Sequence, residues 1–169
     1  MDQPWTTLFV DGNHENHARL ASMPVESWRG GHVHRINDSL LHLMRGEVFE
    51  IAGNTMFVMG GGTSIDVDRR RPYRSWWPEE MPGIDEYLNA ERNLRSCGWR
   101  VDYILTHEAP TSLLASMGQG FRYDQLTRFL DLVDRRVTFK HWYFGHYHLD
   151  RDLDARHTVL FRDIRVLGA

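Results

Sequence analysis

The sequence contains little cysteine and no long apolar run, and these absences exclude several classes of protein. Cys97 is the single cysteine among 169 residues. A disulfide within the chain is therefore impossible, and a cysteine-based zinc site is not expected. No apolar stretch approaches the roughly 20 residues that cross a bilayer, and the first residues lack the basic segment and apolar core of a secretory signal. We therefore expect a cytoplasmic protein without a membrane partner.

Neither sign of charge dominates the composition. Lysine and arginine contribute 20 charges and aspartate and glutamate 23, so the formal net charge is −3. A slightly acidic chain gives no reason to expect nucleic acid as a partner. Histidine, by contrast, is plentiful, with ten residues. Because histidine is the commonest metal ligand and the usual acid–base residue, the placement of these histidines is informative.

Short apolar runs separated by turn residues predict strands, and a helical spacing of apolar residues predicts two helices later in the chain. The expected strands are 8–10, 32–36, 40–44, 48–51, 56–59, 101–105, 142–144 and one or two within 157–166; the expected helices are 84–97 and 123–133; residues 60–82 form a surface loop. Closely spaced strands favour antiparallel pairing. The mixed order predicts an α/β fold with packed sheets flanked by helices.

Three of the expected strands end in a histidine-containing turn. The runs LFV, YIL and WYF are followed by DGNHE, THEAP and GHYH, at residues 8–15, 103–110 and 142–148. Ligands of open α/β sheets bind beyond the carboxyl ends of strands. Three such strands side by side would gather Asn13, His14, His107, His146 and His148 at one rim. Imidazole and amide oxygen suit Mn, Fe, Zn or Ni, whereas an all-oxygen calcium site is disfavoured.

The motifs G-N-H-E, T-H-x-A-P and G-H-x-H, in this order between Gly12 and His148, resemble the later motifs of the calcineurin-like metallophosphoesterases. This resemblance implies a four-layer α/β/β/α sandwich with two divalent transition metal ions, Mn, Fe, Zn or Ni, at the strand ends. It also implies a hydrolase that cleaves small phosphomonoesters or phosphodiesters. The attacking group would be a hydroxide that bridges the two metals.

The resemblance also implies a role for each matching residue. Asn13, His107 and His146 would hold one metal, and His148 would help to hold the other. His14 would be no ligand but the catalytic general acid beside the phosphate. The remaining histidines match no motif. His17 either reaches the site or lies on a helix surface, the pair His32 and His34 is interpreted as a solvated strand face, and three others are interpreted as structural, namely His42, His141 and His157.

One part of the family pattern is missing. The D-x-H and G-D-x-x-D motifs, which would supply the carboxylates, do not occur before Gly12. We therefore expect a single domain over residues 1–169 that is an incomplete sandwich lacking its N-terminal strands, with one weak metal site or none in this chain. Exposed sheet edges would then favour self-association. The alternative is a non-catalytic remnant that acts as a binding module with one metal or none.

Overall fold

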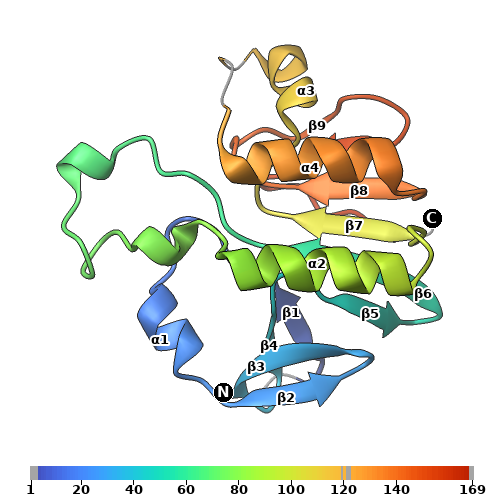
Figure 1. The fold of residues 1–169 in the computed structure, drawn as a ribbon, viewed down its shortest axis with the longest axis horizontal. Helices are drawn as coiled ribbons and strands as arrows, with labels where there is room; N and C mark the ends of the chain where they lie inside the picture. Colours follow the sequence, from blue (N-terminus) through green and yellow to red (C-terminus); the bar gives the residue numbers. More distant parts are fainter. Residues whose placement is uncertain (1–3, 119, 121–122, 168–169) are drawn as a thin grey trace.

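The computed structural model describes residues 4–118, 120 and 123–167, which form two β-sheets with helices on one side (Figure 1). The strands are β1 (Thr7–Phe9), β2 (Val25–Trp28), β3 (Gly31–Asn37), β4 (Leu40–Leu43), β5 (Val48–Ile51), β6 (Asn54–Met59), β7 (Tyr103–Thr106), β8 (His141–Phe144), β9 (Arg151–Asp152) and β10 (His157–Val159). The helices are α1 (His17–Ala21), α2 (Ile84–Ser96), α3 (Thr111–Leu114) and α4 (Gln125–Arg136), with short 3-10 helices at Val67–Arg69, Pro78–Glu80 and Ala115–Met117.

The larger sheet has six strands in the order β5-β6-β7-β8-β10-β9. Strands β6, β7, β8 and β10 run parallel, and the two edge strands run antiparallel to their neighbours. Helices α2 and α4 cover one face (Figure 1). Apolar side chains from this face, such as Ile104 and Trp142, pack against Leu94, Leu130 and Val133 of the helices, and all five are fully buried. The carboxyl ends of β7 and β8 therefore lie together at one edge of a rigid sheet.

The smaller sheet has four strands in the order β1-β4-β3-β2, with β1 parallel to β4 and the other pairs antiparallel. Val33, Leu41 and Leu43 of this sheet pack against Phe49 and Val58 of the larger sheet, and all five are at most 1% exposed. The chain thus forms three layers, in the order helices, six-stranded sheet and four-stranded sheet.

These layers confirm the expected mixed α/β fold, and they correct two expectations of strand pairing. The hairpins β3–β4 and β5–β6 are antiparallel as predicted, but β4 and β5 belong to different sheets. The chain crosses between the sheets at Gly46, whose φ of 76° and close packing against Ala90 of α2 leave no room for a side chain. In addition, β1 lies in the four-stranded sheet and not beside β7 and β8.

Several elements have no counterpart in the sequence-based prediction. These are the short elements β2, α3 and β9, and residues 160–166 form no strand where one was allowed for. The long stretch 60–82 is irregular apart from two 3-10 turns, as expected. Within the described parts of the chain, none of the helices combines the length and apolar composition that a membrane crossing requires.

Candidate functional site

Two histidines meet at the carboxyl ends of the neighbouring strands β7 and β8. His107 directly follows β7 and His146 follows β8 by two residues. Nε2 of His107 lies 3.0 Å from Nδ1 of His146. The turn after β7 is fixed by Thr106, whose hydroxyl donates to the Glu108 carbonyl at 2.6 Å and accepts from the Trp142 indole at 2.8 Å. A buried indole and a backbone carbonyl thus hold the segment that presents His107.

Asn13 reaches the same point from the opposite sheet. It follows β1, and its Oδ1 lies 3.1 Å from Nε2 of His107. The close approach depends on glycine, because a Cβ at Gly12 would lie 2.7 Å from the His107 ring and one at Gly62 would lie 3.1 Å from it. The His107 ring therefore lies between Gly12 and Gly62, two residues that have no side chain. Asn13, His107 and His146 converge across the two sheets, not along one sheet as the sequence suggested.

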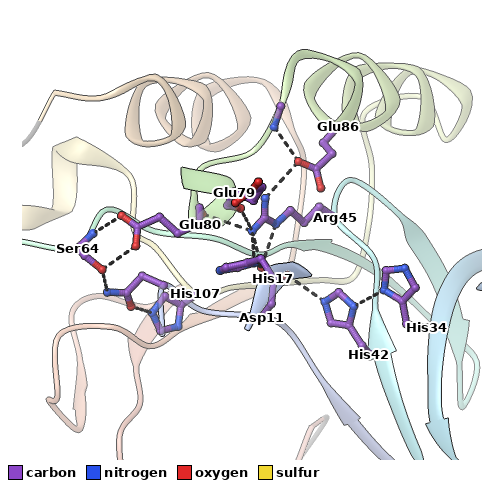
Figure 2. A network of polar contacts seen from close by, with 12 residues as sticks. Asp11, His17, His34, His42, Arg45, Ser64, Glu79, Glu80, Glu86 and His107 are labelled. Carbon is purple, nitrogen blue, oxygen red and sulfur yellow. Dashed lines mark hydrogen bonds and ion pairs between the residues drawn. The ribbon is translucent and has the colours of Figure 1, made fainter. Parts of the chain in front are cut away.

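A chain of hydrogen bonds fixes which end of the Asn13 amide faces His107 (Figure 2). The Asn13 amide nitrogen donates to Oγ of Ser64 at 2.9 Å. Ser64 in turn donates its hydroxyl and its backbone N–H to the two carboxylate oxygens of Glu80, at 2.6 and 2.8 Å. Because Glu80 is only 2% exposed, this carboxylate is a fixed acceptor. The nitrogen of Asn13 is thereby committed to Ser64, and its oxygen is directed at His107.

His146 has a carboxylate on the other side of its ring. Its Nε2 lies 3.7 Å from Oε2 of Glu108, which is fully buried. The other oxygen of Glu108 accepts hydrogen bonds from the Ala109 backbone N–H, at 2.8 Å, and from the Tyr147 hydroxyl. At 3.7 Å the carboxylate adds negative charge beside the ring but accepts no hydrogen bond from it.

The other two predicted site residues lie at the rim of the cluster. His14 is exposed, and its Nε2 lies 3.5 Å from the Asn13 amide nitrogen. His148 adopts a left-handed φ of 52° and stacks on Phe161, with 4.5 Å between ring centroids. No hydrogen bond in the described part of the chain joins His148 to His107 or His146. All five predicted residues nevertheless line one cavity of about 890 Å³.

The electrostatic environment keeps His107 neutral. The pKa of His107 is lowered to about 4, chiefly by burial; the charge of Asp11 acts to raise it, and the nearby His14 and His148 act to lower it. At neutral pH the ring therefore has an unprotonated nitrogen. This nitrogen can serve as an electron-pair donor to a metal ion.

Two imidazoles and one amide oxygen are groups that can serve as ligands of a transition metal. Ligand distances of about 2.1 Å in an octahedral arrangement place neighbouring donor atoms about 3 Å apart. The separations of 3.1 and 3.0 Å around His107 agree with this spacing. Among the described residues, no group of three or more His, Cys, Asp and Glu side chains could hold a metal. The candidate site consists instead of two imidazoles and one amide oxygen.

A second polar cluster lies beside the first, around Asp11 at the end of β1 (Figure 2). Asp11 is 1% exposed and accepts hydrogen bonds from Nε2 of His42 at 3.0 Å and from Arg45 at 2.6 and 2.9 Å. Burial raises the pKa of the Asp11 carboxyl, but these hydrogen bonds and the Arg45 charge hold the pKa well below its usual range. We call these residues, together with His17 and His34, the Asp11 cluster. Within it the charges of Asp11 and Arg45 neutralise each other.

The Asp11 cluster corrects two interpretations of the sequence. His17 is only 6% exposed and packs against Arg45, so it is neither a helix-surface residue nor in contact with His107. His34 is 8% exposed, and its Nδ1 lies 3.0 Å from Nδ1 of His42. Only His32 of the pair on β3 has the exposed side chain that was expected for both.

Three supporting residues of the site were missed by the sequence reasoning. Glu108 directly follows His107, and this adjacency was a usable signal. Ser64 and Glu80 lie in the polar stretch 60–82, where nothing distinguishes them from surface residues. Their role depends on a fold that brings this stretch against Asn13.

Comparisons of the chain with protein-family models, with curated proteins and with solved structures found no match in any of the three. Functional inference for this chain therefore starts from the residues of the site and their geometry.

Proposed function

We propose that this chain is a metal-dependent phosphoesterase that hydrolyses small phosphomonoesters or phosphodiesters, with Asn13, His107 and His146 as metal ligands. The observation that carries the proposal is the convergence of three donor atoms at separations of 3.0 and 3.1 Å. A divalent transition metal in this position would supply a Lewis acid that polarises a phosphoryl oxygen. The order of the three motifs in the sequence adds the resemblance to calcineurin-like metallophosphoesterases.

The residues of the chain have distinct tasks in this proposal. Ser64 orients the Asn13 amide, so this ligand is held before a metal arrives. Glu108 places a carboxylate 3.7 Å from the His146 ring. His14 is exposed, adjoins Asn13 and lines the same cavity. It is therefore placed to give a proton to the leaving alkoxide, which is the usual task of a histidine general acid.

The proposal includes a two-metal centre and a four-layer sandwich as its finer form. Three layers, of helices, sheet and sheet, agree with such a sandwich. His148 lines the cavity but stands apart from the three converging ligands. A second metal would therefore need ligands in addition to His148, whereas the first would be held by Asn13, His107 and His146.

A second candidate function is a non-catalytic binding module with one metal or none. The observation that favours it is the uncharged donor set, because two imidazoles and an amide do not balance the charge of a divalent ion. The buried carboxylate of Glu108 lies 3.7 Å from His146, on the side of the ring away from His107.

Hydrolysis of two chromogenic esters, nitrophenyl phosphate and bis-nitrophenyl phosphate, separates these candidates. The manganese-loaded chain should hydrolyse at least one of them, and chelation should abolish the activity. His14→Asn should lower kcat by on the order of 100-fold at unchanged metal content, as expected for loss of a general acid. His32→Asn, at an exposed histidine outside this cavity, is the matched control and should retain full activity. Stoichiometric metal without hydrolysis of either ester would contradict the enzyme and support the binding module.

A further inference from the structure

His157 is buried where the β9–β10 hairpin meets helix α4, and it is 2% exposed. Its Nδ1 lies 2.9 Å from each carboxylate oxygen of Asp154, which precedes β10 in the hairpin turn. Its Nε2 lies 3.2 Å from Oδ1 of Asp134 on α4. The ring packs between Phe139 and Trp142, at 5.6 and 5.8 Å between centroids. His157 therefore joins the hairpin to the helix through both of its ring nitrogens.

The two carboxylates require a doubly protonated ring. A neutral imidazole has one N–H, and a carboxylate can only accept, so a neutral His157 would turn a lone pair towards Asp134 or Asp154. An imidazolium donates to both. The charges balance in the same form, because Arg156 lies 3.8 Å from Asp134 and two cations then face two anions. Burial acts to lower the pKa of His157, but the two carboxylates outweigh it and raise the pKa above the ordinary 6.5.

The other charged or titratable groups on the neighbouring elements are engaged with one another. Nε2 of His141, on β8, lies 2.8 Å from the Thr158 hydroxyl. This hydroxyl donates to Asp152 of β9 at 2.7 Å, and Arg165 lies 3.7 Å from the same carboxylate. Within the described part of the chain, the carboxylates in contact with His157 are thus those of Asp134 and Asp154.

The hairpin held by His157 leads directly into a wall of the candidate metal-site cavity. Strand β10 pairs with β8 over three residues and with β9 over two, so it has few backbone contacts of its own. The chain continues into Leu160 and Phe161, and both line the cavity. The Phe161 ring stacks on His148. Any loosening of β10 would therefore reach this wall.

We propose that His157 is a pH-sensitive switch, whose imidazolium holds the β9–β10 hairpin and the adjoining cavity wall against α4. When the ring loses a proton, one carboxylate loses its partner and the hairpin loosens. Because the pKa is raised on folding, this stabilisation is complete below the ordinary 6.5 of the unfolded chain and is lost as the pH rises through the folded pKa. The switch is independent of the proposed phosphoesterase function and needs no metal.

The protonation of His157 can be measured on the full chain by NMR spectra that correlate the nitrogens and hydrogens of the imidazole ring. Both nitrogens should be protonated at pH 6.5, and the titration midpoint should lie above this value. Asp134→Asn and Asp154→Asn should each lower the midpoint. Asp131→Asn, on α4 but next to the Ser112 backbone, is the matched control and should leave it unchanged. A midpoint at or below 6.5, or one unmoved by both variants, would overturn the proposal.

Hydrogen exchange measures whether the hairpin loosens. The reporters are the backbone amides of Leu153, which donates to the His157 carbonyl, and of Leu160, which donates to β8. Their protection, corrected for the intrinsic exchange rate at each pH, should fall about 10-fold across the titration, as expected for loss of one hydrogen bond to a charged group. The fall should move to lower pH in Asp134→Asn and be absent in His157→Gln. Constant protection in the parent chain while the ring titrates would contradict the switch.

Discussion

The two polar clusters at the end of β1 differ in the kinds of group that contact one another. In the Asp11 cluster, a carboxylate and a guanidinium neutralise each other, and His42 donates to the carboxylate. In the cluster of Asn13, His107 and His146, two imidazoles and an amide oxygen approach one another, and the Glu108 carboxylate lies 3.7 Å from His146. Proximity of histidines is therefore not a sufficient sign of a metal site. What distinguishes the second cluster is that its contacts around His107 join two imidazoles and an amide oxygen instead of an ion pair, which is why we propose the metal there.

The largest expected effect concerns the Asp11 cluster and protein stability. Asp11→Ala leaves the Arg45 charge buried without its partner, and loss of one member of a buried ion pair typically costs about 3–5 kcal/mol. We expect the free energy of unfolding, measured by urea denaturation, to fall by this amount. Expressed as a free energy, the metal affinity of the folded protein should change far less than the free energy of unfolding.

The matched control for this prediction is Glu91→Gln, which breaks an exposed ion pair with Arg95. Exposed pairs are worth at most about 1 kcal/mol, so the control should be nearly neutral. If Asp11→Ala is as neutral as Glu91→Gln, the Asp11 cluster does not stabilise the fold as described.

The next effect concerns the other cluster and metal binding. His107→Ala removes the central ligand. We expect manganese or zinc affinity to fall on the order of 100-fold or more, because loss of a ligand costs more than loss of a residue that only hydrogen-bonds to a ligand. Calorimetric titration of the metal-free chain measures this directly. His141→Ala, at a histidine remote from the cavity, is the control and should bind metal normally. Equal affinities in both variants would mean that metal binds elsewhere.

A smaller effect is expected from the residues that orient the ligands. Ser64→Ala frees the Asn13 amide to turn its nitrogen towards His107, and we expect metal affinity to fall about 10-fold. Ser64→Thr retains the hydroxyl and should preserve most of the affinity. The same calorimetric titration distinguishes the two. A loss in Ser64→Thr as large as that in Ser64→Ala would assign the effect to packing and not to the hydroxyl.

The pH dependence of stability separates the clusters by the pH range in which each acts. The pKa of His107 falls from its ordinary 6.5 to about 4 on folding, so between these values only the unfolded chain binds this proton. The free energy of unfolding should therefore decrease as the pH falls from 6.5 towards 4, with His17 and His34 acting in the same direction because burial lowers their pKa values too.

Asp11 acts in a separate range, because its depressed pKa leaves its stabilisation intact until the pH falls below the ordinary 3.8. Urea unfolding at a series of pH values measures the free energy of unfolding in both ranges. His107→Ala should reduce the slope between pH 6.5 and 4 by about 1 kcal/mol per pH unit or less. An unchanged slope in the variant would contradict the burial of a neutral His107.

The parts of the structure set by local pattern could be predicted from the sequence. Helix α2 and the strands that precede His107 and His146 follow from apolar spacing, and the histidine turns follow from the ends of those strands. The convergence of Asn13, His107 and His146 was also expected. The sequence did not predict that Asn13 reaches this point from the other sheet, in which β1 pairs with β4. Local sequence does not encode which sheet a strand joins.

The remaining features depend on contacts between distant segments. The turn at Gly46 looks like an ordinary hairpin turn, and only packing against Ala90 makes it a crossing between sheets. His17 looks like a surface residue of a short helix, but Arg45 lies 28 residues away in sequence and buries it. Ser64 and Glu80 become important only when the two ends of the loop between them meet beside Asn13.

The most direct test of the central claim is a crystal structure of the chain soaked with manganese, with anomalous diffraction recorded to locate the ion. We predict an anomalous peak coordinated by Oδ1 of Asn13, Nε2 of His107 and Nδ1 of His146, which is lost in crystals of His107→Ala. A peak held by other residues, or no peak at a metal concentration that saturates binding in solution, would contradict the assignment of this cluster as a metal site.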